Sequence, residues 1–304
     1  MKVMVLAGGP DREREVSLRS GAQVAAALRE AGHAVRERDL MPDDQTALGG
    51  FAAWGGEVVF PVFHGKWGEG GGAQRLLETA GVKYVGCREA AARLCTDKAA
   101  TKRRLLDAKL PTPAFELVNS ESQPTLPTPV VIKPNDDGSS IDLAICPDPE
   151  AVKKAWAELS PRNPVLLVER FITGKEMTVG IVEDESGEPV ALPTIQIVPA
   201  TAFYDYDAKY VRDDTRYLFD AVPEAVETSL RGLAVRVFRE LGCRQLSRVD
   251  LFLDDADQPW VIEVNTMPGF TSHSLLPMAA ARSGLPLPRL VDRLVTRAAR
   301  DWIG

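Results

Sequence analysis

The stretch KVMVLAGG, residues 2–9, decides the fold class of the N-terminal part of the chain. It is an apolar run that ends in two glycines, which is the pattern of a buried strand followed by a tight turn. The Ala-rich residues 17–32 then predict a helix, and the alternation continues with a strand at 57–65, a short helix at 71–81 and a strand at 82–86. Strands alternating with helices of this length predict a parallel sheet with helices on its faces.

Composition and charge exclude several classes of protein. Hydrophobic residues make up 45% and charged residues 26% of the 304 positions, as in ordinary globular proteins. The net charge is -7 and no Lys/Arg block stands out, which argues against a nucleic-acid partner. We find neither a signal peptide nor an apolar run of about 18 residues, so we expect a cytoplasmic protein that does not span a membrane. Four widely spaced cysteines without a C-x-x-C pair are expected to be reduced: Cys87, Cys95, Cys146 and Cys243.

The character of the sequence changes twice along the chain. From Thr96 a helix, Pro-rich segments, the strand VVIKP (130–134), a helix over 149–159 and the strand at 164–172 predict a small α+β unit. A third block starts near EMTVGIV (176–182) and contains a long helix, two strands and further helical segments. We therefore expect three parts, at residues 1–95, 96–178 and 179–304.

Two late strands carry polar side chains at regular spacing. Side chains alternate between faces along a strand, so Arg248 and Asp250 share one face of SRVDLFLD (247–254), and Glu263 and Asn265 share one face of WVIEVN (260–265). If the turn between the strands makes them antiparallel, the four side chains converge. Carboxylate and amide oxygens are the ligands that Mg²⁺ prefers, and Arg248 beside them would meet developing negative charge. An ordinary polar face of an antiparallel sheet would show the same pattern.

A nucleotide site needs groups that bind phosphate. Lys133 ends a buried strand, and the turn DDGSS (136–140) after it offers backbone N–H groups. Lys98 is a second candidate, although either lysine alone is more often a solvated surface residue. The sequence contains no G-x-x-x-x-G-K-[ST], which excludes a P-loop enzyme, and GEGGGA (68–73) is a weak dinucleotide signal because it does not directly follow a strand.

The run FYDYDAKY, residues 203–210, holds three of the five tyrosines of the chain. It fits neither the alternation of a strand nor the three- to four-residue repeat of a helix. It reads as a loop, and aromatic anchors with charged tips are typical of a lid that closes over a ligand.

Six motifs together resemble one known family. They occur in the family's order and spacing: EREVSLRSG (13–21), HGKWGEGG (64–71), VIKPNDDGSS (131–140), FYDYDAKY (203–210), SRVD (247–250) and EVNTMPGFTSHSLLP (263–277). On these motifs the chain resembles, over essentially its whole length, the D-alanine:D-alanine ligases, which are ATP-grasp enzymes of peptidoglycan precursor synthesis. The resemblance implies an α/β fold with an N-terminal Rossmann-like parallel-sheet domain and a two-part ATP-grasp α+β module. It also implies a homodimer.

The resemblance implies a reaction as well. ATP would phosphorylate the carboxylate of a first D-alanine, and the amine of a second D-alanine would attack the acyl phosphate, with release of ADP and phosphate. Such a reaction calls for cations at the phosphates, metal ions and a closed lid that keeps water out. The resemblance implies that the metal ions are two Mg²⁺ (or Mn²⁺).

The residues of the site follow from the resemblance position by position. Two metal ions would be held by Asp250, Glu263 and Asn265. ATP would be bound by Lys98, Lys133, Glu169, Arg170, Phe171, Ile172, Glu176 and Lys209. The catalytic group would comprise Glu13, Ser139, Tyr210, Arg248 and Gly269. The two D-alanine molecules would contact Glu13, His64, Ser274 and Leu275.

Within these sets, several roles are specific. Arg248 and the N–H of Gly269 would stabilise the oxyanion, and Lys209 would reach the γ-phosphate from the lid. Glu13 would hold the ammonium of the first D-alanine and join Ser139 and Tyr210 in a hydrogen-bonded triad. The tyrosine in the lid favours an amine over D-lactate as the second nucleophile.

The chain departs from the family pattern at two places. Gly70 stands where many members carry an acidic residue, although Glu69 is kept, and we expect little catalytic effect. Pro10 and Asp11 stand in the first loop where others often carry Lys or Thr and Ser, which affects the expected conformation of that loop rather than the role of Glu13.

Three other functions compete with this interpretation. An ATP-grasp ligase for another carboxylate and amine is disfavoured by FYDYDAKY and SHSLL (272–276). A nucleotide-binding regulatory protein without activity would be expected to have lost a metal ligand or Arg248, and none is lost. A dehydrogenase built on the N-terminal block would need the glycine fingerprint that the sequence lacks.

Overall fold

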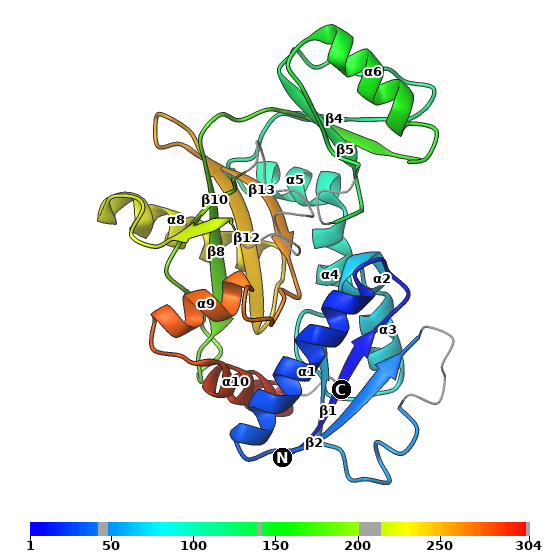
Figure 1. The fold of residues 1–304 in the computed structure, drawn as a ribbon, viewed down its shortest axis with the longest axis vertical. Helices are drawn as coiled ribbons and strands as arrows, with labels where there is room; N and C mark the ends of the chain where they lie inside the picture. Colours follow the sequence, from blue (N-terminus) through cyan, green and yellow to red (C-terminus); the bar gives the residue numbers. More distant parts are fainter. Residues whose placement is uncertain (42–47, 139–141, 201–213, 302–304) are drawn as a thin grey trace.

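The structure is a computed structural model that describes residues 1–41, 48–138, 142–200 and 214–301. Three sheets follow one another along the long axis of the molecule (Figure 1). The N-terminal sheet lies at one end and a small four-stranded sheet with one helix lies at the other. Within the described ranges, no helix is long and apolar enough to cross a membrane.

The N-terminal sheet is parallel, as the alternation of strands and helices predicts. Its order is β2-β1-β3, with β1 (Lys2–Gly8) in the centre between β2 (Ala34–Leu40) and β3 (Val58–Pro61). The following helices are α1 (Arg14–Glu30), α2 (Gly65–Glu69), α3 (Gly72–Thr79) and α4 (Glu89–Thr96). The turn after β1 requires glycine at position 8, because φ is +98° and a Cβ there would lie 2.2 Å from Asp39 Oδ1.

Two strands of this region differ from the sequence-based expectation. Residues 82–86 form no strand and pair with the sheet through a single bridge between Val59 and Tyr84, because the chain turns away at Gly86, where φ is +106°. Conversely, the polar sequence AVRERDL forms the edge strand β2, whose residues are mostly exposed. An edge strand with one solvated side does not show an apolar pattern.

The four-stranded antiparallel sheet is the small α+β unit expected from the sequence. Its order is β4-β7-β5-β6, with β4 (Phe115–Val118), β7 (Leu166–Arg170), β5 (Val130–Pro134) and β6 (Ala144–Cys146). The helix α6 (Pro149–Leu159) covers one face, and Asp148 caps it by accepting a hydrogen bond from the N–H of Ala151. The helix α5 (Lys98–Asp107) precedes β4 in the chain.

The third sheet has six strands in the order β11-β10-β8-β12-β13, with β9 paired to β8. Its strands are β8 (Lys175–Glu183), β9 (Pro189–Ala191), β10 (Ile195–Val198), β11 (Arg216–Leu218), β12 (Leu246–Leu253) and β13 (Pro259–Asn265). The helices that follow or cover it are α8 (Glu224–Glu240), α9 (Leu275–Arg282) and α10 (Leu287–Arg300). Because β8 already begins at Lys175, the expected boundary between residues 178 and 179 lies inside this strand.

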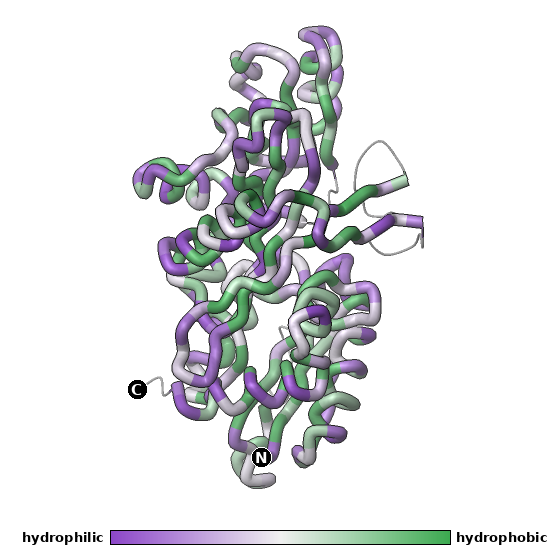
Figure 2. Tube along the Cα trace, turned by 90° about the vertical axis from the view of Figure 1, so that its left-hand side faces the viewer, coloured by the Kyte–Doolittle hydropathy of each residue, from purple (hydrophilic) through white to green (hydrophobic). Residues whose placement is uncertain are grey.

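One hydrophobic core joins the first and third sheets. Buried residues of β1, α1 and β3 pack with residues of β8, β10, α9 and α10, and the ring of Phe60 meets that of Phe270 edge to face at a centroid distance of 5.4 Å. In Figure 2, hydrophobic and hydrophilic residues alternate along the helices of the outer surface. The shared core holds the carboxyl ends of β1 and β3 close to β12 and β13, where the candidate site lies.

Candidate active site

Two neighbouring cavities lie where the three sheets meet. The larger has a volume of about 470 Å³ and is lined by residues of β5, β7, β8, β10, β12 and β13. The smaller has a volume of about 110 Å³ and is lined by residues of the N-terminal part, the loop after β5 and the segment after β13. The two cavities share the lining residues Lys98, Asp137, Gly138, Arg248 and Glu263.

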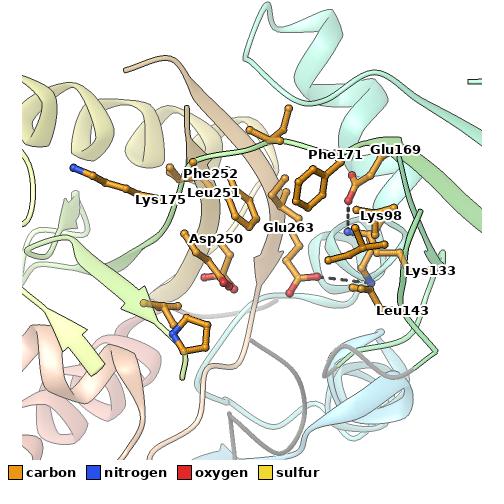
Figure 3. A pocket seen from close by; sticks show the side chains of 18 of the residues that line it. Lys98, Lys133, Leu143, Glu169, Phe171, Lys175, Asp250, Leu251, Phe252 and Glu263 are labelled. Atoms are coloured by element: carbon orange, nitrogen blue, oxygen red, sulfur yellow. Dashed lines mark ion pairs between the residues drawn. The ribbon is translucent and has the colours of Figure 1, made fainter. Parts of the chain in front are cut away.

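The polar residues of β12 and β13 converge as their spacing predicts. The two strands are antiparallel, and the register pairs Arg248 with Asn265 and Asp250 with Glu263. The carboxylates of Asp250 and Glu263 point into the larger cavity (Figure 3). Their side chains are 16% and 31% exposed, so they are open to a ligand, Asp250 from the inner strand β12 and Glu263 from the edge strand β13.

Arg248 is held in place by the carboxylate beside it. Its Nε donates to Asp250 Oδ1 at 2.8 Å and its Nη2 to Asp250 Oδ2 at 2.7 Å. Thr178 on the neighbouring strand β8 also donates to Asp250 Oδ1, at 2.6 Å. Since the guanidinium is oriented by two parallel hydrogen bonds, it presents a fixed positive charge at the junction of the two cavities.

The donor set suits a hard divalent cation. Asp250 and Glu263 supply carboxylate oxygens toward one space, and Asn265, which lines the smaller cavity, adds an amide oxygen that already accepts from the N–H of Met267. Among the described residues, no group of three or more His, Cys, Asp and Glu side chains is placed to hold a metal. Two carboxylates with an amide leave several coordination positions to water or phosphate, which is how Mg²⁺ usually binds.

Both candidate phosphate-binding lysines line the larger cavity. Lys98 Nζ lies 3.9 Å from Glu263 Oε2, and Lys133 Nζ lies 2.5 Å from Glu169 Oε1; Figure 3 draws both ion pairs. Burial lowers the pKa of Lys98, and the charge of Glu263 opposes this shift. Both lysines are therefore buried cations held by carboxylates, rather than the solvated surface residues that an isolated lysine usually is.

The segment ERFI contributes to the same cavity in different ways. Arg170, Phe171 and Ile172 line it, and the guanidinium of Arg170 stacks on the ring of Trp260 at 4.5 Å. The side chain of Glu169 is buried, with its carboxylate between two lysines. Glu176, at the start of β8, also lines the larger cavity.

The expected substrate residues line the smaller cavity. It brings together five residues that the resemblance had selected from distant motifs, namely Glu13, His64, Gly269, Ser274 and Leu275. A Cβ at Gly269 would lie 2.7 Å from Ser274 Oγ, so a larger residue there would displace that hydroxyl. The remaining predicted site residues, Ser139, Lys209 and Tyr210, lie outside the described residues.

The smaller cavity also contains a pair that the sequence did not single out. His64 Nδ1 lies 3.1 Å from Glu69 Oε1, and both side chains line the cavity. Burial raises the pKa of Glu69, and its hydrogen bond with His64 partly opposes this shift. The two residues stand five positions apart in one motif, HGKWGEGG, and that spacing is the signal that could have suggested the contact.

The atypical first loop has a clear structural role. Asp11 Oδ2 accepts from the N–H groups of Trp67 at 3.0 Å and Gly68 at 3.3 Å. These bonds tie the loop after β1 to the segment that carries His64 and Glu69. Asp11 thus positions the two walls of the smaller cavity relative to each other.

Comparison with known proteins agrees with this geometry. Residues 109–296 match the family model described as D-ala D-ala ligase C-terminus. The D-alanine–D-alanine ligase B of Chromobacterium violaceum is 43% identical over 93% of both chains, and the D-alanine–D-alanine ligase of Dechloromonas aromatica is 40% identical over 99% of this chain and 98% of its own.

A solved structure covers the same length. The D-alanine–D-alanine ligase of Bacillus anthracis complexed with ATP superposes with a TM-score of 0.84 at 25% identity, over 99% of this chain and 98% of that one. The predicted α/β fold, a parallel-sheet domain followed by an ATP-grasp module, is confirmed by this match. Because a family model matches more than half of the chain and relatives of about 40% identity cover nearly all of it, the chain belongs to the D-alanine–D-alanine ligase family.

Proposed function

We propose that the protein joins two D-alanine molecules into D-alanyl-D-alanine at the expense of ATP, for peptidoglycan precursor synthesis. The observation that carries this proposal is the β12–β13 register, which brings Arg248, Asp250 and Glu263 together beside two adjoining cavities. The larger cavity has room for a nucleotide, and the smaller one suits small amino acids. The names of the full-length relatives support the same substrates.

The first step is phosphoryl transfer. ATP lies in the larger cavity with its phosphates toward Lys98 and Lys133, and the carboxylate of the first D-alanine attacks the γ-phosphorus to give an acyl phosphate and ADP. The ammonium of this D-alanine is held by Glu13. Asp250, Glu263 and Asn265 would hold two Mg²⁺ (or Mn²⁺) ions, which when bound neutralise charge on the phosphate oxygens.

The second step is acyl transfer. The amine of the second D-alanine attacks the acyl carbonyl, and the negative charge on the tetrahedral oxygen is met by Arg248 and the N–H of Gly269. Phosphate leaves as the amide forms. Ser274 and Leu275 line the part of the smaller cavity that would take this second substrate.

The second amine must lose a proton before or during its attack. The Glu69–His64 pair lines the same cavity, and a carboxylate whose pKa is raised by burial suits a proton acceptor. We assign the pair this role. The lid residues Lys209 and Tyr210, together with Ser139, complete the proposal by closing the site over the nucleotide and excluding water.

The protein would work as a homodimer, which the family resemblance implies. It would act in the cytoplasm on small molecules rather than on nucleic acid, in keeping with its net charge of -7. We also propose that the three parts expected at residues 1–95, 96–178 and 179–304 act around the shared site, with the second boundary moved to the start of β8 at Lys175.

The test is product analysis with Mg²⁺ and ATP. The protein is supplied with D-alanine, with L-alanine, or with D-alanine plus D-lactate, while ADP release is followed and products are identified by mass. We expect the dipeptide from D-alanine and no turnover with L-alanine. Turnover with another carboxylate and amine but not with D-alanine would overturn the substrate assignment and leave the site geometry intact.

A further inference from the structure

The carboxylate of Glu169 lies between two lysines, of which one lines the nucleotide cavity and the other lies behind it. Lys133 Nζ is 2.5 Å from Oε1 and lines the nucleotide cavity. Lys102 Nζ is 2.7 Å from Oε2, does not line the cavity and is fully buried. Glu169 therefore links a lysine at the ligand to a lysine behind it.

Lys102 is itself held from two sides. Its Nζ donates to Thr112 Oγ1 at 2.8 Å, and Thr112 Oγ1 donates to the carbonyl of Val261 on β13 at 2.8 Å. The ammonium also lies 5.9 Å from the centre of the Phe115 ring on β4. These contacts come from both sheets that border the cavity, so the position of Lys102 is determined by the core rather than by solvent.

The charges around Glu169 explain why a second lysine is needed. Burial raises the pKa of Glu169, but the charges of Lys102 and Lys133 outweigh this effect and hold the pKa at about 2. The other charged groups near the cluster are Lys98 on α5 and Glu263 on β13. With Lys102 removed, Lys133 would be the nearest cation, and Glu169 would either take up a proton or draw Lys133 away from the cavity.

We propose that Lys102 is a positioning residue for nucleotide binding: through Glu169 it holds the ammonium of Lys133 at the place where it meets the phosphates of ATP. The inference rests on the proposed function for the identity of the nucleotide. It adds a residue that touches neither ATP nor D-alanine. Removing a group that orients a ligand from behind costs about 10–100-fold in affinity at metal sites, and we expect an effect of this order here.

The first experiment compares ATP binding by the full-length protein and its Lys102→Met variant in a direct titration without D-alanine. We expect the dissociation constant for ATP to rise at least about tenfold. In steady-state assays KM for ATP should rise more than kcat falls. Lys153→Met is the matched control, because Lys153 pairs with Glu150 on the exposed face of α6 and should bind ATP like the unchanged protein.

A pH series separates positioning from a purely structural role. A carboxylate with a depressed pKa makes its contribution above its ordinary pKa and loses it as the pH falls through the depressed value. Removing Lys102 raises the pKa of Glu169, so in the variant the contribution of the ionised carboxylate disappears at a higher pH. The ratio of the two dissociation constants should therefore grow as the pH falls from about 8 to about 5. A constant ratio contradicts the proposal.

A double-mutant cycle supplies a second test. Glu169→Gln keeps the shape of the side chain but removes the charge through which Lys102 acts, so Lys102→Met should have little further effect on ATP binding in that background. Fully additive effects would overturn the inference. If Lys102→Met does not fold, Lys102→Gln replaces it, since an amide still donates to Thr112 but carries no charge, and the same pH dependence is expected.

Failure of the Lys102 proposal can be distinguished from failure of the proposed function. ATP binding is measured without an amino acid, so an incorrect substrate assignment leaves it unchanged. Suppose that the protein without substitutions makes the dipeptide, but that the Lys102 variants bind ATP as tightly as it does at every pH. That result would overturn the proposed role of Lys102 and leave the proposed function intact.

Discussion

Asp250 and Glu263 stand opposite each other on neighbouring antiparallel strands, and their carboxylates enter one cavity. Each lies two residues from a further polar group of the same strand, Arg248 and Asn265, which are themselves register partners. A side-chain period of two and one tight turn at residues 254–258 are enough to assemble this set. Its chemistry can be tested residue by residue.

Replacing Glu263 should remove turnover. Glu263→Gln keeps the size of the side chain but removes the negative charge that would attract a divalent cation to the phosphates. We expect kcat for ADP release with D-alanine to fall at least about 100-fold. Glu188→Gln is the control, since Glu188 is exposed and pairs with Arg239 at the surface. Near-normal ADP release by the Glu263 variant would refute the metal assignment.

Replacing Arg248 should affect chemistry more than binding. Arg248→Lys keeps one positive charge but loses the paired hydrogen bonds to Asp250, so the charge is no longer fixed at the junction of the cavities. We expect kcat to fall about 100- to 1,000-fold, with a smaller change in KM for ATP. Arg282→Lys, at an exposed ion pair with Asp220, should behave normally. A loss confined to KM would argue against the oxyanion role.

The Glu69–His64 pair predicts a specific pH profile. Burial raises the pKa of Glu69, and only the ionised form accepts a proton, so kcat/KM for D-alanine should decline on the acid side at a pH above the ordinary range of a glutamate. Glu69→Gln should lower the plateau and abolish this decline. His64→Gln should move the decline to higher pH, because the hydrogen bond that lowers the pKa of Glu69 is weakened. A profile for Glu69→Gln that retains the decline would exclude Glu69 as its origin.

Gly174 should be needed for stability. It follows the ERFI segment at the wall of the larger cavity with φ at +154°, and a Cβ there would lie 2.1 Å from the carbonyl oxygen of Leu253. Gly174→Ala should lower the free energy of unfolding by about 1–3 kcal/mol in a denaturant titration. Gly232→Ala is the matched control inside α8, where a Cβ meets no atom within 4 Å. It should raise stability by about 0.5–1 kcal/mol. Equal effects of the two substitutions would contradict the steric argument.

Much of the site could be predicted because its residues sit in regular elements or in linear motifs. The convergence of Arg248, Asp250, Glu263 and Asn265 follows from alternation along two strands and a short turn, and the structure confirms that the two strands are antiparallel. The pairing of Glu69 with His64 was not predicted, although both stand in one motif. The edge strand β2 was missed because its exposed, charged residues lack an apolar pattern.

The sequence by itself determined the α/β alternation of the N-terminal part, the family and the chemical types of the site residues, because periodicity and short motifs are local properties of the chain. Only the tertiary structure decided which charges meet. No local sequence pattern distinguishes Lys102 and Glu169 from the many lysines and glutamates that are exposed. Their ion pair forms because α5, β5 and β7 pack together and remove both side chains from water. Burial and pairing depend on contacts between segments far apart in the chain, and no local pattern records them.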